Sequence, residues 1–293
     1  MSSFQLTPHQ IQFMDTFGYL HLPGLLNDRI EEIDEAFEEL LRLHGSDNHD
    51  GQSRFYMVPF LNHSEYLCTL LDDERIDGIA TELLGESYQF WCSDGNYYAG
   101  NTGWHSDTAW PEPIRYYKMA IYLDPMTRET GALRVIPGSH RFGEGYAETL
   151  HELLMDAGKG PVLGLQGYEI PAVALETTPG DLVLFNHSTK HSSWGGSSKR
   201  RMFTLCYTAE HSGESLGHFR DFVTECGFTR KDVFGVPDGP LLTTASPQRL
   251  RHLQQLVNNV PEAEPESNKD SHRHSASPRA SKLDGVTPIS DRA

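Results

Sequence analysis

The sequence predicts a mainly β protein with flanking helices, whose strands form a sandwich or barrel of jelly-roll type. Three observations lead to this prediction. Many short β-like runs follow one another between residues 87 and 208. Turn dipeptides such as Pro137-Gly138 and Pro179-Gly180 separate these runs. Helical patterns gather before them, so helices are expected at one end of a β core.

Three helices are predicted before the β core. The first begins at Thr7-Pro8, because threonine caps a helix and proline suits its first position. It ends at Gly18, and the later two follow from apolar residues at helical spacing. The predicted elements of this region are helices over about residues 7–18, 27–44 and 73–84, a strand over 19–22 and a loop over 46–54.

The strands of the β core are predicted over residues 87–92, 96–99, 116–123, 131–136, 168–173, 181–186 and 202–208, with one inserted helix over 151–157. From about residue 261 the chain has no aromatic and almost no large apolar residue, so we expect it to be disordered. The expected organisation is one domain over 1–260, with a helical portion over 7–84 and a β core over 87–210, followed by a tail over 261–293.

The charge and the cysteines limit the classes of partner and compartment. The formal net charge is −17, which argues against a protein held to nucleic-acid phosphates or to an anionic membrane surface. No apolar stretch is long enough to cross a bilayer, and no leader pattern precedes Pro8. The four cysteines show no metal-binding spacing, which favours free thiols in a reducing compartment. A cytoplasmic protein is therefore expected.

A histidine and an aspartate stand two residues apart in Gly103-Trp104-His105-Ser106-Asp107. Residues i and i+2 of a strand point the same way, so His105 and Asp107 can meet one metal ion. Such three-residue strings also occur by chance, so the pair alone does not decide the function.

A second element delivers further histidines. The turn Pro179-Gly180 leads into an apolar strand, after which come His187 and His191. Two histidines and one carboxylate on one face of an octahedral ion leave three positions open, as non-haem Fe(II) oxygenases require. This pattern leaves open which of the two histidines completes the site.

Arginines follow the second element at Lys199-Arg200-Arg201, where the next strand begins. An arginine beside the metal can hold a carboxylate through two parallel hydrogen bonds, which lysine cannot reproduce. A metal triad followed by such an arginine is the layout for binding 2-oxoglutarate. Because side chains alternate across a strand, only one of Arg200 and Arg201 can point inward.

Three blocks carry a resemblance to a known family: Trp104 to Asp107, Leu123 to His140, and Gly180 to Tyr207. The middle block, LDPMTRETGALRVIPGSH, is the most specific, with Thr130 where the family has asparagine. On these residues the chain resembles the phytanoyl-CoA dioxygenase family, with some likeness to ectoine hydroxylase. The resemblance implies a cupin-like double-stranded β-helix and a dioxygenase that uses Fe(II), 2-oxoglutarate and O2 and releases succinate and CO2.

The resemblance also implies which residues bind iron. His105 and Asp107 match the first two ligands, and His191 matches the third because it stands six residues after Phe185. By the same comparison His187 is a loop or rim residue.

For the co-substrate, Arg200 fits the family arginine better than Arg201, since Tyr207 lies seven residues beyond it. Asn96 and Ser193 match polar groups that contact the co-substrate. The family often has a lysine where this chain has Tyr98, which leaves that contact open.

Substrate contacts are expected from Trp110, Tyr117 and Arg115, which stand near the metal motif or enter a central strand. A small polar molecule is expected as the substrate, because no basic cluster is present to hold the phosphates of coenzyme A.

Three alternative functions remain: a halogenase, which Asp107 disfavours; a catalytically silent binding module; and a cupin-like zinc hydrolase or isomerase, which would have no use for the arginine.

Overall fold

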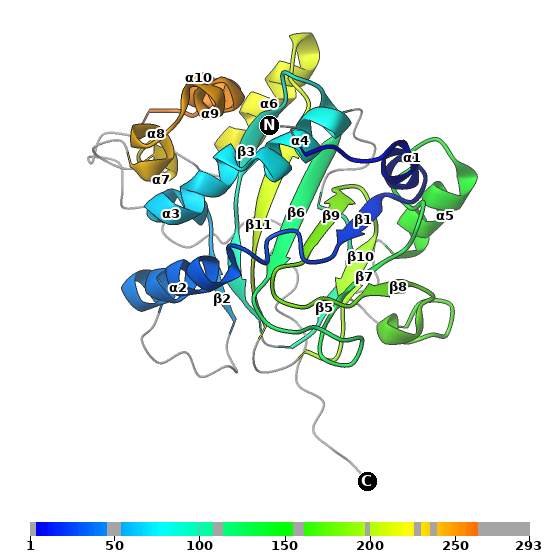
Figure 1. Ribbon diagram of the computed structural model, residues 1–293. Helices are drawn as coiled ribbons and strands as arrows, with labels where there is room; N and C mark the ends of the chain where they lie inside the picture. The colour runs from blue at the N-terminus through cyan, green and yellow to red at the C-terminus, as the bar shows by residue number, and fades with distance from the viewer. Residues whose placement is uncertain are drawn as a thin grey trace, which may run out of the picture.

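The computed structural model describes residues 4–45, 54–98, 100–107, 114–154, 161–196, 200–225, 230–234 and 239–262. Within these ranges two antiparallel sheets face each other, and helices cover the outer face of the larger sheet (Figure 1). This confirms the predicted mainly β fold with flanking helices. Trp110 and almost all of the predicted tail lie outside the described residues.

The larger sheet has seven strands in the order β1-β9-β6-β11-β4-β2, and β3 also pairs with β11. Their bounds are Tyr19–Leu22 (β1), Phe55–Met57 (β2), Gln89–Cys92 (β3), Gly95–Tyr97 (β4), Tyr116–Tyr122 (β6), Leu182–Asn186 (β9) and Arg201–Thr208 (β11). The smaller sheet has the order β5-β10-β7-β8, with Thr102–His105 (β5), His191–Ser193 (β10), Leu133–Val135 (β7) and Val173–Leu175 (β8).

The central strands of the larger sheet are covered on both faces. Tyr117, Met119 and Ile121 of β6 point into the core beneath the helices. Ala120 and Tyr122 point the other way, into the space between the two sheets. This alternation follows from the two-residue period of a strand, and it decides which side chains can reach a pocket between the sheets.

The N-terminal helices begin and end much as their local signals predict. The Thr7 hydroxyl accepts a hydrogen bond from the Gln10 amide at 3.3 Å, and Gly18 ends the helix with φ +81°. The helices before the β core are Pro8–Phe17 (α1), Ile30–Leu40 (α2), Glu65–Cys68 (α3) and Glu74–Leu84 (α4). A helix over Gly145–Leu154 (α5) lies between β7 and β8, and those after β11 are Gly213–Glu225 (α6), Arg230–Phe234 (α7), Pro240–Thr243 (α8), Pro247–His252 (α9) and Gln254–Asn259 (α10).

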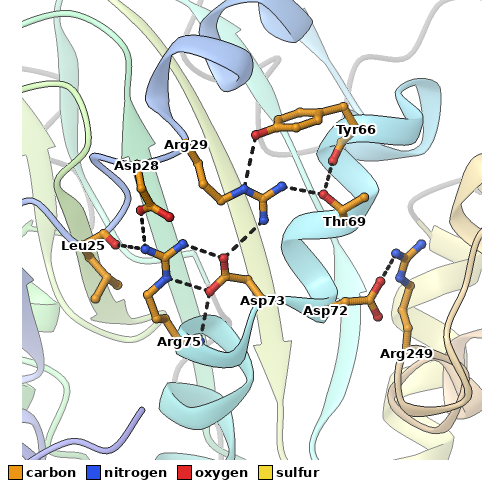
Figure 2. Close-up of polar contacts among 9 residues, drawn as sticks. All are labelled: Leu25, Asp28, Arg29, Tyr66, Thr69, Asp72, Asp73, Arg75 and Arg249. Atoms are coloured by element: carbon orange, nitrogen blue, oxygen red, sulfur yellow. Dashed lines mark hydrogen bonds and ion pairs between the residues drawn. The ribbon is translucent and has the colours of Figure 1, made fainter. Parts of the chain in front are cut away.

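A group of ion pairs joins the segment before α2 to α4 (Figure 2). The carboxylate of Asp73 accepts hydrogen bonds from Arg29 at 3.2 Å and from Arg75 at 2.7 and 2.8 Å. Asp72 pairs in the same way with Arg249 of α9. These contacts hold the N-terminal and C-terminal helices together above the larger sheet.

The prediction of a strand over residues 168–173 was wrong. The structure has a 3₁₀ helix over Gly167–Glu169, and the strand begins later, at Val173. Backbone carbonyl oxygens of this segment accept hydrogen bonds from side chains. Trp104 Nε1 donates to the Gly167 oxygen and Arg134 donates to the Tyr168 oxygen, both at 2.8 Å. Because these groups are already bonded, they do not join a strand ladder.

The inserted helix predicted over 151–157 instead begins at Gly145, and residues 155–160 lie outside the described part. The helices after β11 were not predicted. None of the helices in the described ranges combines the length and apolar character that crossing a membrane demands.

Candidate metal and co-substrate site

Antiparallel pairing brings two distant histidines together. His105 ends β5, His191 begins β10, and the two residues lie directly opposite each other in the ladder. Asp107 follows β5 and completes a group whose ligand atoms all lie within 4.8 Å of one another. Asp107 Oδ1 is 3.7 Å from His105 Nε2 and 3.6 Å from His191 Nε2.

The two imidazoles are oriented as metal ligands. His105 Nδ1 lies 2.8 Å from the Gly103 oxygen, and His191 Nδ1 lies 2.9 Å from the Thr189 oxygen. A carbonyl oxygen can only accept, so each Nδ1 carries the proton and each Nε2 keeps a lone pair. Metal-binding histidines are usually held this way through their second nitrogen. The donor set therefore fits a divalent ion such as Fe(II), with two neutral nitrogens and one carboxylate.

Charges around the site favour the same protonation states. Burial would raise the pKa of the Asp107 carboxyl, but Lys118 and the neighbouring histidines outweigh burial and hold that pKa well below its usual value. Burial, with His105 beside it, lowers the pKa of His191 to about 3. At neutral pH the group therefore presents an ionised carboxylate and neutral imidazoles, as a metal site requires.

The rings of His187 and His140 do not join this group, although the Asp107 amide donates to the His187 backbone oxygen at 2.8 Å. His187 is buried, and its ring packs near Trp91 and Tyr116, with centroids 5.7 and 5.8 Å away. His140 Nε2 faces the Asp15 oxygen, 3.2 Å away in α1. Neither belongs to the possible metal-binding group found among the described residues.

Arg200 enters the same pocket just before β11. It is 2% exposed, and one guanidinium nitrogen donates to the Gly131 oxygen at 3.0 Å and to the Ser193 hydroxyl. Its guanidinium also lies over the Tyr98 ring, 4.5 Å from the centroid. In the part of the chain that the structure describes, no carboxylate pairs with Arg200. Burial lowers the pKa of this arginine, as expected for a cation without an acid.

Arg201 points to the other face of the sheet. It donates to Asp124 at 2.9 Å and pairs with Asp34 at 2.7 Å and with Glu38. Its charge is therefore used within the protein, unlike that of Arg200, which has no acid partner among the described residues.

One pocket between the sheets contains both the metal-binding group and Arg200. Near Arg200 its walls include Tyr98, Tyr122 and Met202, and near the metal-binding group they include Asp94, Lys118 and Thr204. The metal-binding group and the guanidinium of Arg200 are thus parts of one cavity.

The two residues expected beside the co-substrate are placed differently. Ser193 lines the pocket, donates to the Gly131 oxygen at 2.7 Å and accepts a hydrogen bond from Arg200. Asn96 is completely buried, and both ends of its amide are bonded to protein: its oxygen accepts from Arg54 at 3.1 Å, and its nitrogen donates to Asp94 at 2.6 Å. Asn96 therefore supports a pocket residue and is not itself among the pocket walls.

The structure corrects the expected substrate contacts. Tyr117 lies in the helix-side core, on the face of β6 that turns away from the pocket, and Arg115 is exposed before that strand. The residue of β6 that reaches the metal-binding group is Lys118, which the sequence analysis missed. The sequence signal for Lys118 was a charged residue within the otherwise uncharged run YYKMAIY.

Comparisons with known proteins agree with this geometry. The sequence profile described as phytanoyl-CoA dioxygenase (PhyH) matches residues 14–203. A 2-aminoethylphosphonate dioxygenase from the uncultured bacterium HF130_AEPn_1 is 27% identical over 226 residues, which cover 70% of this chain and 82% of that protein. An ectoine dioxygenase from Sphingopyxis alaskensis is 30% identical over 151 residues, which cover 45% of this chain and 49% of that protein.

A similar solved structure is EctD from S. alaskensis with bound Fe, at a TM-score of 0.53 and 25% identity, covering 70% of this chain and 77% of that one. The same protein has also been solved with 2-oxoglutarate and 5-hydroxyectoine.

A jelly-roll core whose pocket is lined by two histidines and one aspartate, together with the family match, defines a non-haem iron oxygenase dependent on 2-oxoglutarate. Within that class, the chain belongs to the phytanoyl-CoA dioxygenase family, whose profile matches well over half of its length.

Proposed function

We propose that this protein hydroxylates a small polar molecule, with Fe(II) bound by His105, Asp107 and His191 and 2-oxoglutarate bound by Arg200. The observation that carries the proposal is the buried guanidinium of Arg200, which lines the same pocket as the metal-binding group and has no acid partner among the described residues. Burying such a charge is costly unless a ligand pairs with it.

When bound, Fe(II) activates O2 while 2-oxoglutarate is converted to succinate and CO2. The chain itself contributes binding and orientation. His105 and His191 offer Nε2 lone pairs fixed by their backbone hydrogen bonds, and Asp107 offers Oδ1 beside them. These three side chains would hold the ion beside the pocket, which would accept the 2-oxo acid end of the co-substrate there, while the distal carboxylate would pair with Arg200.

Neighbouring residues hold Arg200 in place for the distal carboxylate of 2-oxoglutarate. Ser193 and the Gly131 carbonyl accept hydrogen bonds from one guanidinium nitrogen, and Tyr98 stacks against the plane. Gly131 also makes the approach possible, because a Cβ there would lie 2.3 Å from Arg200 Nη1. A planar guanidinium fixed in this way is preorganised for bidentate carboxylate binding.

The proposed substrate class is a small polar molecule. Two relatives are named for 2-aminoethylphosphonate and ectoine, and these are small polar compounds. The pocket wall near the metal-binding group is polar and includes Asp94, Lys118 and Thr204. Such a wall suits a substrate that makes directed polar contacts.

The test has two parts. First, under anaerobic conditions, Fe(II) and 2-oxoglutarate added to the protein should produce the weak visible charge-transfer band of an iron-bound 2-oxo acid. Second, small amino acids, aminophosphonates and other polar metabolites are screened for succinate formation above the substrate-free rate. Absence of the band in the wild-type protein would refute the proposal. A band without stimulation by any substrate would favour a silent binding module.

A further inference from the structure

The two oxygens of the Asp107 carboxylate face different partners. Oδ1 lies 3.6 and 3.7 Å from the Nε2 atoms of His191 and His105. Oδ2 lies 3.0 Å from Nζ of Lys118, which projects from the middle of β6. The carboxylate is thus divided between the metal position on one side and an ammonium group on the other.

Lys118 is itself held by a second carboxylate. Its Nζ is 3.5 Å from Asp94 Oδ2, and both side chains are largely buried. Two carboxylates, Asp107 and Asp94, therefore face the one ammonium group of Lys118.

Asp94 is fixed in turn by groups from neighbouring strands. Its Oδ1 accepts from Asn96 of β4 at 2.6 Å, and its Oδ2 accepts from the Thr204 hydroxyl of β11. Asn96 is oriented by Arg54, which donates to its oxygen at 3.1 Å. A continuous set of polar contacts thus runs from Arg54 near the surface to Oδ2 of Asp107.

We infer that Lys118 is a positioning residue that reserves Oδ2 of Asp107, so that this carboxylate offers only one oxygen to the metal. A carboxylate can bind a metal ion through one oxygen or both. With the second oxygen engaged by Lys118, three coordination positions remain for 2-oxoglutarate and O2. The inference rests on the proposed function and adds a residue that neither the metal-binding group nor the co-substrate site includes.

Packing alone does not account for a lysine at this place. The next inward residues of β6 are Ala120 and Tyr122, which contribute to the apolar contact between the sheets. A methionine at position 118 would fill similar space without desolvating a charge. The lysine is explained by its contacts with the two carboxylates.

The test is an anaerobic titration of Lys118→Met with metal and then with 2-oxoglutarate, beside the wild type. In this variant the freed Oδ2 should also bind the metal. 2-Oxoglutarate must then displace that oxygen before it can bind. The 2-oxoglutarate concentration at half-maximal band should rise about tenfold or more, because the co-substrate would compete with a second carboxylate oxygen once the ion pair is lost. Fe(II) binding should be retained, because no ligand is removed. In the Co(II)-substituted protein, the d–d spectrum without 2-oxoglutarate should differ from that of the wild type.

Three further variants sharpen the result. Lys118→Arg keeps a donor cation and should restore most of the 2-oxoglutarate affinity. Asp94→Asn should give a smaller shift in the same direction, because Lys118 remains but is less firmly held. It also decides the question if Lys118→Met does not fold. Tyr117→Phe, on the opposite face of the same strand, should titrate as the wild type.

The outcomes are separable. Wild-type titration and an unchanged Co(II) spectrum in Lys118→Met would overturn the positioning role. Loss of both Fe(II) and 2-oxoglutarate binding would also overturn it, because it would show that Lys118 only supports the fold of the site. Failure of the wild type to form the band would refute the proposed function itself.

Discussion

His191 lies directly opposite His105 in the β5–β10 ladder, so a single antiparallel pair of short strands brings together the two imidazoles of the candidate metal site. Their ring centroids are 4.2 Å apart. Since Asp107 follows β5 at once, the position of the whole group depends on the register of this one pair.

The metal ligands can be tested one at a time. His105→Ala, Asp107→Ala and His191→Ala should each abolish the charge-transfer band with Fe(II) and 2-oxoglutarate, because each removes one of three donors. His187→Ala and His140→Ala should retain the band, since both rings lie outside the group. Retention of iron by His191→Ala, with its loss in His187→Ala, would assign the third ligand to His187 instead.

Arg200→Ala should weaken 2-oxoglutarate binding by about two to four decades, the effect of removing one partner of a buried charge pair. Fe(II) binding should persist because the metal-binding group is untouched. Arg200→Lys should recover only part of the affinity, since an ammonium lacks the planar fork. The measurement is titration of the charge-transfer band with 2-oxoglutarate.

Arg201→Ala serves as the neighbouring comparison. It should lower the melting temperature, because it leaves the buried Asp124 without its arginine, while 2-oxoglutarate affinity remains near that of the wild type. A large loss of affinity here, with none at Arg200, would move the co-substrate site to the other face of the strand.

Gly131→Ala should imitate the loss of Arg200. The residue has φ +104°, and the added Cβ would meet the guanidinium at 2.3 Å, so Arg200 would have to move. We expect at least a tenfold loss of 2-oxoglutarate affinity, by the scale on which about 1.4 kcal/mol changes a binding constant tenfold. Gly143→Ala is the matched control: its φ is +86°, with nothing within 4 Å of the added carbon. Equal affinity loss in both variants would point to backbone strain and not to contact with the arginine.

The ionised Asp73 carboxylate should make the stability of the helices over the larger sheet depend on pH. Burial would raise its pKa, but the hydrogen bonds from Arg75 and Arg29 outweigh it and lower the pKa to about 2 from 3.8. A depressed pKa contributes stability that is present above pH 3.8 and is lost as the pH falls toward 2. Asp73→Asn should therefore cost about 2 kcal/mol of unfolding free energy near neutral pH, with the difference shrinking on acidification.

Chemical denaturation at several pH values measures this effect. Glu39→Gln, which breaks an exposed ion pair with Arg42, should leave the denaturation midpoint almost unchanged at every pH. An Asp73→Asn difference that did not depend on pH would mean that the Asp73 charge contributes nothing to the stability of the helix layer.

The sequence by itself determined the elements whose signals are local. Thr7, Pro8 and Gly18 define α1 because a cap and a stop act within one turn. The spacing of His105 and Asp107 made them candidate ligands of one metal, since neighbours two apart on a strand share a face. The family resemblance then selected His191 over His187, a choice that the local pattern left open.

Tertiary structure alone decided which face of each strand meets the pocket. Every residue of β11 is buried, and the apolar core extends on both sides of β6. Alternation of apolar and polar residues therefore could not show to which face of β6 Tyr117 and Lys118 each point. Sheet pairing sets that face, and it directs Lys118 toward Asp107 and Tyr117 into the helix-side core. The same pairing separates Arg200, which lines the pocket, from Arg201, which is neutralised by Asp124, because strand faces are assigned by partners distant in the chain.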